Sequence, residues 1–432
     1  MRGLLVCFDP RGGRWMADFA LSGCRMPAPC PKRHAARLPS EAMSSDTINL
    51  PRLSAAHADE SSPTGKPAVV PPPAKGAAVR DPFFDNAKYL LVVLVVIGHS
   101  LGPIAGDMRA VTAVYMLVYA FHMPAFVMMC GYFSRSFTGR PDQVRKLITG
   151  VLLPYLAFYV IYQLMYKLAW GREFKISITE PEYLLWFMMA LLLWRLTAPV
   201  WRAVRWPVAL TVLVSIGAGL TNTGYDLGLS RVLMFLPWFV LGMQLRREHF
   251  RVLRSRIPKR WAFVTMIAAL GGAWVVSPYV TSNWLLMQMG NDDLKVSAPV
   301  YAGMRILLFV LSGVLTVAFL ALVPRRELPI TALGAVTMFP YLLHGLVVKT
   351  FEGLGGYEYV YNAGVIGAAV LVCAAVALAL LLSTAPVRYA LRPLVEPRFP
   401  RWLEPVSPGQ HRRTAFDAFD PSAPASRTSN RS

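Results

Sequence analysis

Long apolar runs alternate with short polar segments over most of this chain. A helix needs about 20 apolar residues to cross a bilayer, because it rises only about 1.5 Å per residue. Ten runs approach that length, although several are short or interrupted, at approximately 89–105, 111–133, 147–168, 183–200, 207–222, 231–245, 261–279, 300–323, 330–349 and 360–384. The pattern predicts an all-α, polytopic integral membrane protein with about ten transmembrane helices.

The two ends of the chain lack this pattern. Residues 1–82 are rich in Ala, Pro, Ser and Arg, and residues 391–432 are polar and rich in Pro and Ser. Such segments bury too little apolar surface to offset the entropy of folding, so both are predicted to be disordered tails. The apolar start, LLVCF, is too short for a signal-peptide core, and the first span is expected to direct insertion. We therefore expect the transmembrane domain at 83–390.

The charge of the chain supports this membrane interpretation. The sequence is 55% hydrophobic and only 16% charged, yet its formal net charge is +20. Fifteen lysines and arginines lie in alternate gaps between the predicted spans, seven of them in the segment 246–260, against four in the other gaps. The positive-inside rule then places both termini in the cytoplasm, and we expect a multi-pass protein of the plasma membrane. No basic-aromatic motif accompanies the charge, which argues against nucleic acid as a partner.

The five cysteines do not form a recognisable framework. Cys7, Cys24 and Cys30 lie in the N-terminal tail, and Cys130 and Cys373 lie inside predicted spans. No Cys-x-x-Cys or Cys/His spacing indicates zinc, so neither a metal site nor a structural disulfide is predicted. A cysteine within a span is more typical of a small packing residue than of a nucleophile.

A stripe of titratable residues follows the first apolar run. Lys88 and His99 are eleven residues apart, so on a helix they share a face to within roughly 20° and lie about 16 Å apart. Asp85 falls on the same side, and the stripe extends from the cytoplasmic rim to mid-membrane. It suits a long ligand with an anionic end at the rim and a reactive end at the centre, and acyl-coenzyme A has that form.

The second run adds His122 at a similar depth, two residues before Pro124. Proline removes a backbone donor and tends to kink a helix, which would open space for a site. Neutral imidazole can take a proton from a hydroxyl and release it again near physiological pH. Other interpretations remain open, because an intramembrane histidine can also join two helices by a hydrogen bond, Lys88 can anchor a helix end, and Asp85 can cap one.

These residues are where a family resemblance appears. The spacing Asp85-x2-Lys88-x10-His99 resembles the first-helix signature of the membrane acyltransferase-3 family, usually Asp-x2-Arg-x10-His, and it is closest to the fucose 4-O-acetylase-like branch. Further similar segments, which carry the resemblance from 83 to 390, are FHMPAFVMMCGYFSRS (121–136), LLPYLAFY (152–159), LLWFMMALLLWRL (184–196), FLPWFVLGMQLRR (235–247) and MFPYLLHG (338–345).

The resemblance implies an O-acyltransferase. Such an enzyme takes an acyl group, commonly acetyl, from cytoplasmic acyl-CoA and esterifies a hydroxyl of a sugar or glycan. Carried over from the resemblance, His99 would be the catalytic histidine and Lys88 the basic residue that binds the donor. Beyond the resemblance, we expect His122 to assist His99, and Asp85, Arg145 and Lys146 to contribute to donor binding. Lys88 stands where the family more often has arginine. A guanidinium can bind a phosphate through two parallel hydrogen bonds, whereas the lysine ammonium offers only a compact positive charge.

The acceptor is expected on the extracytoplasmic side. Candidate contacts there are Trp186, Arg231, Arg305 and His344, each of which could instead be an interfacial anchor or a helix–helix partner. Direct transfer and an acyl-histidine intermediate both fit the sequence. Two non-enzymatic alternatives are a transporter of a modified sugar or lipid, and a membrane partner or sensor that acts through its tails.

Overall fold

The computed structural model describes residues 80–397, except 175–176, 178 and 222–225, together with 7–8 and 15–16. The strands β1 (Cys7–Phe8) and β2 (Trp15–Met16) pair antiparallel in a separate unit, Met1–Ala74. All other residues of the two predicted tails before 80 and after 397 lie outside the described part.

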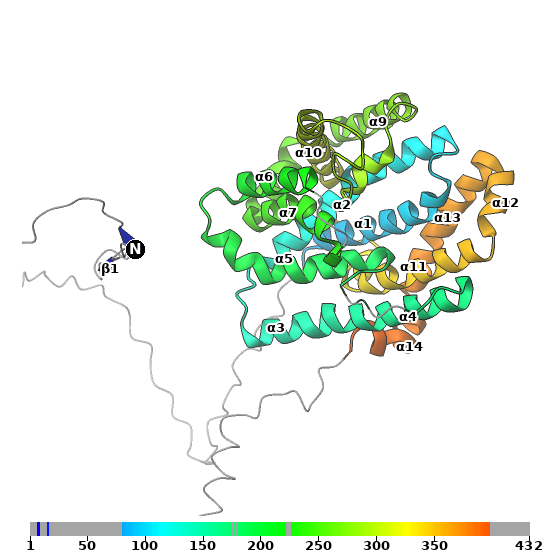
Figure 1. The fold of residues 1–432 in the computed structure, drawn as a ribbon, viewed down its shortest axis with the longest axis horizontal. Helices are drawn as coiled ribbons and strands as arrows, with labels where there is room; N and C mark the ends of the chain where they lie inside the picture. Colours follow the sequence, from blue (N-terminus) through cyan, green and yellow to red (C-terminus); the bar gives the residue numbers. More distant parts are fainter. Residues whose placement is uncertain are drawn as a thin grey trace, which may run out of the picture. The chain divides into compact units, whose positions relative to one another are not determined.

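The described residues from 80 onward form a body of helices (Figure 1). Its α-helices are α1 (Pro82–Leu101), α2 (Arg109–Ser134), α3 (Pro141–Leu147), α4 (Leu153–Trp170), α5 (Trp186–Ala203), α6 (Pro207–Leu220), α7 (Leu229–Gln244), α8 (Arg247–Arg256), α9 (Lys259–Val276), α10 (Ala298–Leu322), α11 (Met338–Gly353), α12 (Gly356–Asn362), α13 (Gly364–Leu382) and α14 (Ala385–Val395). Shorter helical turns are η1 (Gly102–Ile104), the π-helical η2 (Ile148–Leu152), η3 (Tyr183–Leu185), η4 (Asp226–Gly228), η5 (Ser282–Leu286) and η6 (Thr331–Ala335).

Each of the ten predicted apolar runs overlaps one of these α-helices over most of its length, which confirms the all-helical membrane fold for this part of the chain. Six segments of the described residues are long and apolar enough to cross a bilayer: Pro82–Ile104, Arg109–Ser134, Pro141–Trp170, Tyr183–Ala203, Ala298–Leu322 and Gly364–Leu382. Helices α6 and α7 are apolar but shorter. The count of about ten spans therefore stays a prediction beyond these six.

The N-terminus of α1 is fixed by polar contacts. Asp81 is its N-cap and accepts a hydrogen bond from the Phe83 amide at 3.1 Å, with Pro82 at the first helical position, where no amide donor is needed. One turn later the Asn86 amide donates to the carbonyls of Pro324 and Arg326, each at 3.0 Å. These contacts hold the start of α1 against the loop between α10 and α11.

Helix α1 lies among α2, α11 and α13, and α2 crosses α7 at short range (Figure 1). The α2–α7 crossing depends on glycine, because a Cβ on Gly131 would lie 1.9 Å from the Phe239 carbonyl oxygen and one on Gly242 would lie 2.0 Å from that of Met128. Small residues permit such backbone approach between membrane helices. The crossing fixes α2, and with it His122, against the helix that carries Arg231.

Candidate active site

The polar stripe of α1 begins at a cavity near the start of the helix. Lys88 Nζ lies 2.7 Å from Asp85 Oδ1, and Asp81 rather than Asp85 caps the helix. This rim cavity has a volume of about 420 Å³ and is lined by Arg80, Asp81, Phe84, Asp85, Lys88, Tyr132, Phe133, Arg135, Ser136 and Arg247. Four of its lining residues are cations and two are carboxylates, so the rim cavity can accept an anion.

His99, near the other end of α1, lines a second cavity of about 380 Å³. This central cavity collects residues from α1, α2, α5, α7 and α11 and from the turns between helices. Its lining comprises Val95, His99, Gly102, Pro103, Tyr115, Tyr119, His122, Met123, Tyr183, Leu184, Trp186, Phe187, Arg231, Phe235, Leu285, Leu286, Tyr341, Lys349 and Glu352. Four predicted site residues therefore meet here: His99, His122, Trp186 and Arg231.

The His99 ring is held by an aromatic partner that sequence reasoning missed. Its Nδ1 lies 3.0 Å from the Tyr183 hydroxyl, and the two rings meet edge to face at 4.9 Å. Tyr183 has φ of 46°, a left-handed backbone conformation that is strained for a residue with a side chain. Because Nδ1 is engaged, Nε2 is the nitrogen available to a substrate. When Nδ1–H donates to Tyr183, Nε2 carries the lone pair that a general base needs.

The second histidine is held in a defined tautomer. His122 Nδ1 lies 2.7 Å from the Val118 carbonyl oxygen, which can only accept, so Nδ1 carries the proton and Nε2 the lone pair. The ring also packs edge to face on Tyr119 at 4.7 Å. Helix α2 stays continuous across Pro124, two residues further on. His122 can therefore accept a proton or hydrogen-bond a hydroxyl in the central cavity.

The structure places the predicted acceptor residues in different surroundings. The Arg231 guanidinium lies 5.0 Å from the Trp186 ring centroid and donates to Gln288, and both Arg231 and Trp186 line the central cavity. His344 is buried behind His99, with ring centroids 5.2 Å apart, and its Nδ1 donates to the Pro340 carbonyl at 2.8 Å. His344 thus supports the site from within the protein.

Arg305 lies away from the central cavity and ties α10 to η5 and the loop that follows it. It is fully buried, and its guanidinium donates to the Tyr301 hydroxyl at 2.8 Å and to the carbonyls of Trp284 and Met289 at 3.0 and 3.1 Å. Hydrogen bonds to a hydroxyl and two backbone oxygens make it a packing residue, since a buried guanidinium must use its donors.

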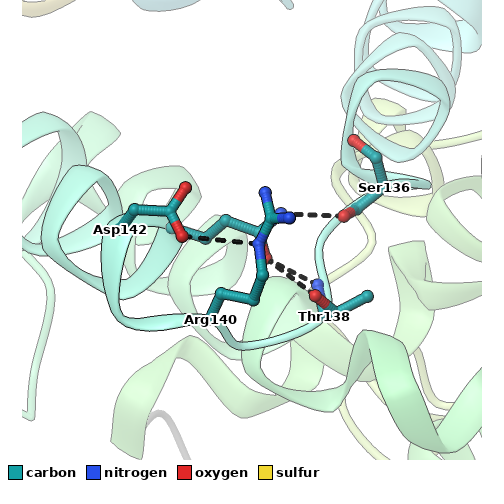
Figure 2. A network of polar contacts seen from close by, with 5 residues as sticks. Ser136, Thr138, Arg140 and Asp142 are labelled. Carbon is teal, nitrogen blue, oxygen red and sulfur yellow. Dashed lines mark hydrogen bonds and ion pairs between the residues drawn. The ribbon is translucent and has the colours of Figure 1, made fainter.

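Arg145 and Lys146 lie in the last turn of α3 and line neither cavity. The loop before α3 is fixed by polar contacts (Figure 2). Arg140 pairs with Asp142 at 3.4 Å, and Gln143 accepts from the Thr138 amide at 2.7 Å and donates to the Ser136 carbonyl at 2.9 Å. This network sets where the two basic residues emerge from the helical body.

The central cavity also contains an ion pair that the sequence did not single out. Lys349 Nζ lies 2.7 Å from Glu352 Oε2, and the same ammonium lies 4.9 Å from the Tyr183 ring centroid. Charged residues at the end of an apolar run were the only sequence signal for it. Carboxylate, ammonium, guanidinium and aromatic faces in one cavity suit a polar ligand with several hydroxyl groups.

The rim cavity and the central cavity share no lining residue. Between Lys88 and Val95, which line one cavity each, the side chains of Leu91 and Val92 are fully buried. The polar stripe of α1 therefore has one end in each of two separate cavities. Lys88 lies at the anion-accepting rim cavity, and His99 lies at the central cavity deeper in the helical body.

A family model described as an acyltransferase domain matches residues 81–384. The matched segment contains every residue that lines the central cavity. No curated protein and no solved structure matches the chain.

Proposed function

Since the chain belongs to the acyltransferase-3 family, we propose that it transfers an acyl group, the acetyl group in the first instance, from cytoplasmic acyl-CoA to a hydroxyl of a sugar, a glycan or a related acceptor. The observation that carries this proposal is the central cavity, in which His99, hydrogen-bonded to Tyr183, meets His122, Trp186 and Arg231. We further propose that the chain belongs to the fucose 4-O-acetylase-like branch of the family, because of the Asp85-x2-Lys88-x10-His99 spacing in α1.

The proposed reaction uses His99 as a general base. Its Nε2 takes the proton of the acceptor hydroxyl while that oxygen attacks the thioester carbonyl carbon. The tetrahedral intermediate then expels the CoA sulfur, which receives the proton from the imidazolium, so that the ester and free CoA are the products. Tyr183 accepts from Nδ1–H throughout and stabilises the imidazolium. His122, with its lone pair on Nε2, orients the acceptor hydroxyl.

The acceptor is proposed to lie against Trp186 and Arg231 in the central cavity. Sugar rings pack on aromatic faces, and the Lys349–Glu352 pair offers a donor and an acceptor for further hydroxyls. His344 contributes by holding the His99 ring in place.

The donor is proposed to approach from the cytoplasm through the rim cavity. Lys88, held by Asp85, and the arginines of the rim cavity supply positive charge for the CoA phosphates, and Arg145 and Lys146 in the last turn of α3 are proposed to add to it. The excess of basic residues in alternate gaps supports a plasma-membrane protein with both termini in the cytoplasm.

The proposal is tested with the purified full chain in lipid nanodiscs, labelled acetyl-CoA and a panel of sugars. Wild type should form a labelled ester, and His99→Ala should lower the rate at least about 100-fold. His249→Ala, on exposed helix α8, is the matched control and should leave the rate unchanged. Full activity of His99→Ala would refute the catalytic assignment. Uptake of an unmodified sugar by proteoliposomes that hold the protein, without ester formation, would favour a transporter.

A further inference from the structure

A second basic residue lies on the cytoplasmic approach to the site, on a different helix from Lys88. Arg195 belongs to α5, and its Nε donates to the Ser134 hydroxyl at 3.1 Å. Ser134 is the last residue of α2, so the guanidinium lies level with the cytoplasmic end of that helix. Across the described residues no carboxylate pairs with Arg195, and the bond to Ser134 is its only hydrogen bond. A cation at this depth without an anionic partner is costly unless a ligand supplies one.

One face of α2 leads from the central cavity to this arginine. Met123, Phe126, Cys130 and Ser134 recur at spacings of three and four residues, which places them on one side of the helix. Met123 lines the central cavity and Ser134 holds Arg195. Eleven residues separate these two, a rise of roughly 16 Å along the helix.

Lys88 flanks the same end of α2 from the side of α1. Its ammonium lies 5.4 Å from the ring centroid of Phe133, the neighbour of Ser134. Lys88 already has Asp85 as a partner, whereas Arg195 keeps the planar fork of its guanidinium free of any carboxylate.

We propose that Arg195 is a phosphate-binding residue for the acyl-CoA donor. Its terminal nitrogens bind phosphate oxygens in the bidentate manner of guanidinium, Ser134 orients the side chain, and Lys88 adds a point charge from α1. The acyl-pantetheine arm then runs along the Met123–Ser134 face of α2 toward His99. This inference rests on the proposed function and identifies which side chain anchors the donor.

The path along this face passes one aromatic contact. Phe126 packs edge to face on Phe187 with ring centroids 5.3 Å apart, and Phe187 lines the central cavity. The two rings have to part when the donor arm enters, so the anchoring charge of Arg195 also holds the donor while the path opens.

The experiment compares donors with and without phosphates on the full chain in nanodiscs. Arg195→Gln should raise KM for acetyl-CoA at least about tenfold, as expected for loss of a charged hydrogen bond, with kcat nearly unchanged. KM for S-acetylpantetheine, which has no phosphate, should be the same in both proteins. Arg195→Lys keeps the charge without the planar guanidinium, so its KM for acetyl-CoA should lie between those of wild type and Arg195→Gln. Arg205 is exposed beyond the end of α5, and Arg205→Gln should have the KM of wild type.

Binding of CoA to a His99→Ala background, measured by calorimetry, separates this inference from the proposed function. CoA should bind that variant, and adding Arg195→Gln should weaken binding at least about tenfold. Unchanged CoA affinity, or an equal KM increase for both donors, would refute the role of Arg195 and leave the acyltransferase proposal standing. Absence of CoA binding to His99→Ala itself would overturn both.

A thiol measurement on the native arginine covers the case in which Arg195→Gln does not insert. Cys130 lies on the proposed path and can be modified by a maleimide in a chain whose other cysteines are replaced by serine: Cys7, Cys24, Cys30 and Cys373. CoA should slow modification of Cys130 and pantetheine should not. Equal protection by both, or by neither, would refute the phosphate anchor.

Discussion

At the scale of single residues, the hydrogen bond between His99 and Tyr183 sets the chemistry of the site. The 3.0 Å contact engages Nδ1 and leaves Nε2 for the proposed acceptor hydroxyl. The structure holds Tyr183 in a strained conformation to make this contact, and strain of this kind concentrates at functional sites.

Replacing Tyr183 by Phe tests that contact while keeping the ring. We expect kcat to fall about tenfold, the equivalent of one hydrogen bond of about 1.4 kcal/mol, with KM for acetyl-CoA nearly unchanged. The reason is that the imidazolium loses its acceptor, although the donor site is untouched. Steady-state kinetics measure the effect, and Tyr359→Phe, on an exposed tyrosine of α12, is the control. A rise in KM with constant kcat would show that Tyr183 binds substrate instead.

The sequence alone pointed to candidate site residues only where a polar residue type is rare in its surroundings. Histidines inside apolar runs are conspicuous, and helical spacing put Asp85, Lys88 and His99 on one face of α1. Arg231 and Arg305 were indistinguishable, since both are arginines near the ends of apolar runs. Packing separates them, because one lines the central cavity and the other donates to the backbone. The roles proposed for Tyr183 and Arg195 depend on contacts between segments far apart in sequence, which no local pattern reveals.

At the scale of helices, apolar periodicity predicted most of the fold. Each of the ten apolar runs overlaps an α-helix, whereas the short helices α3, α8, α12 and α14 were not foreseen, because they are polar or follow breaks in the pattern. The packing of α2 on α7 was equally invisible. The packing depends on glycines whose Cα faces the backbone of another helix. Several other glycines in these runs have no atom within 4 Å of where a Cβ would lie, and the sequence does not distinguish the two kinds.

Gly131→Ala tests the α2–α7 crossing. The added methyl would lie 1.9 Å from the Phe239 carbonyl oxygen, so the helices must separate. We expect a loss of about 2 kcal/mol in the free energy of unfolding, seen as a lower thermal midpoint in detergent. Gly217→Ala in α6 is the control, since nothing lies within 4 Å of its added Cβ and alanine favours a helix. Equal midpoints for Gly131→Ala and wild type would show that the crossing tolerates a side chain.

At the scale of the whole molecule, the proposed catalytic and donor sites lie within residues 80–397. The first lining residue of the rim cavity is Arg80, and the last of the central cavity is Glu352. The family match covers 81–384. We therefore expect donor binding and acyl transfer to take place in the helical body. Residues before Arg80 would affect the reaction only by acting on that body.

A chain that starts at Lys75, preceded by an initiator methionine, tests this division. It removes the unit Met1–Ala74 and retains Arg80 and the Asp81 cap of α1, so we expect insertion and transfer activity within about twofold of the full chain. Removing Asp81 as well, by starting at Pro82, should lower stability by about 1 kcal/mol and raise KM for acetyl-CoA, because the cap and the Arg80 charge are lost. Membrane fractionation and labelled-ester formation measure both. Loss of activity on starting at Lys75, with insertion intact, would instead favour a sensor or partner that acts through its tail.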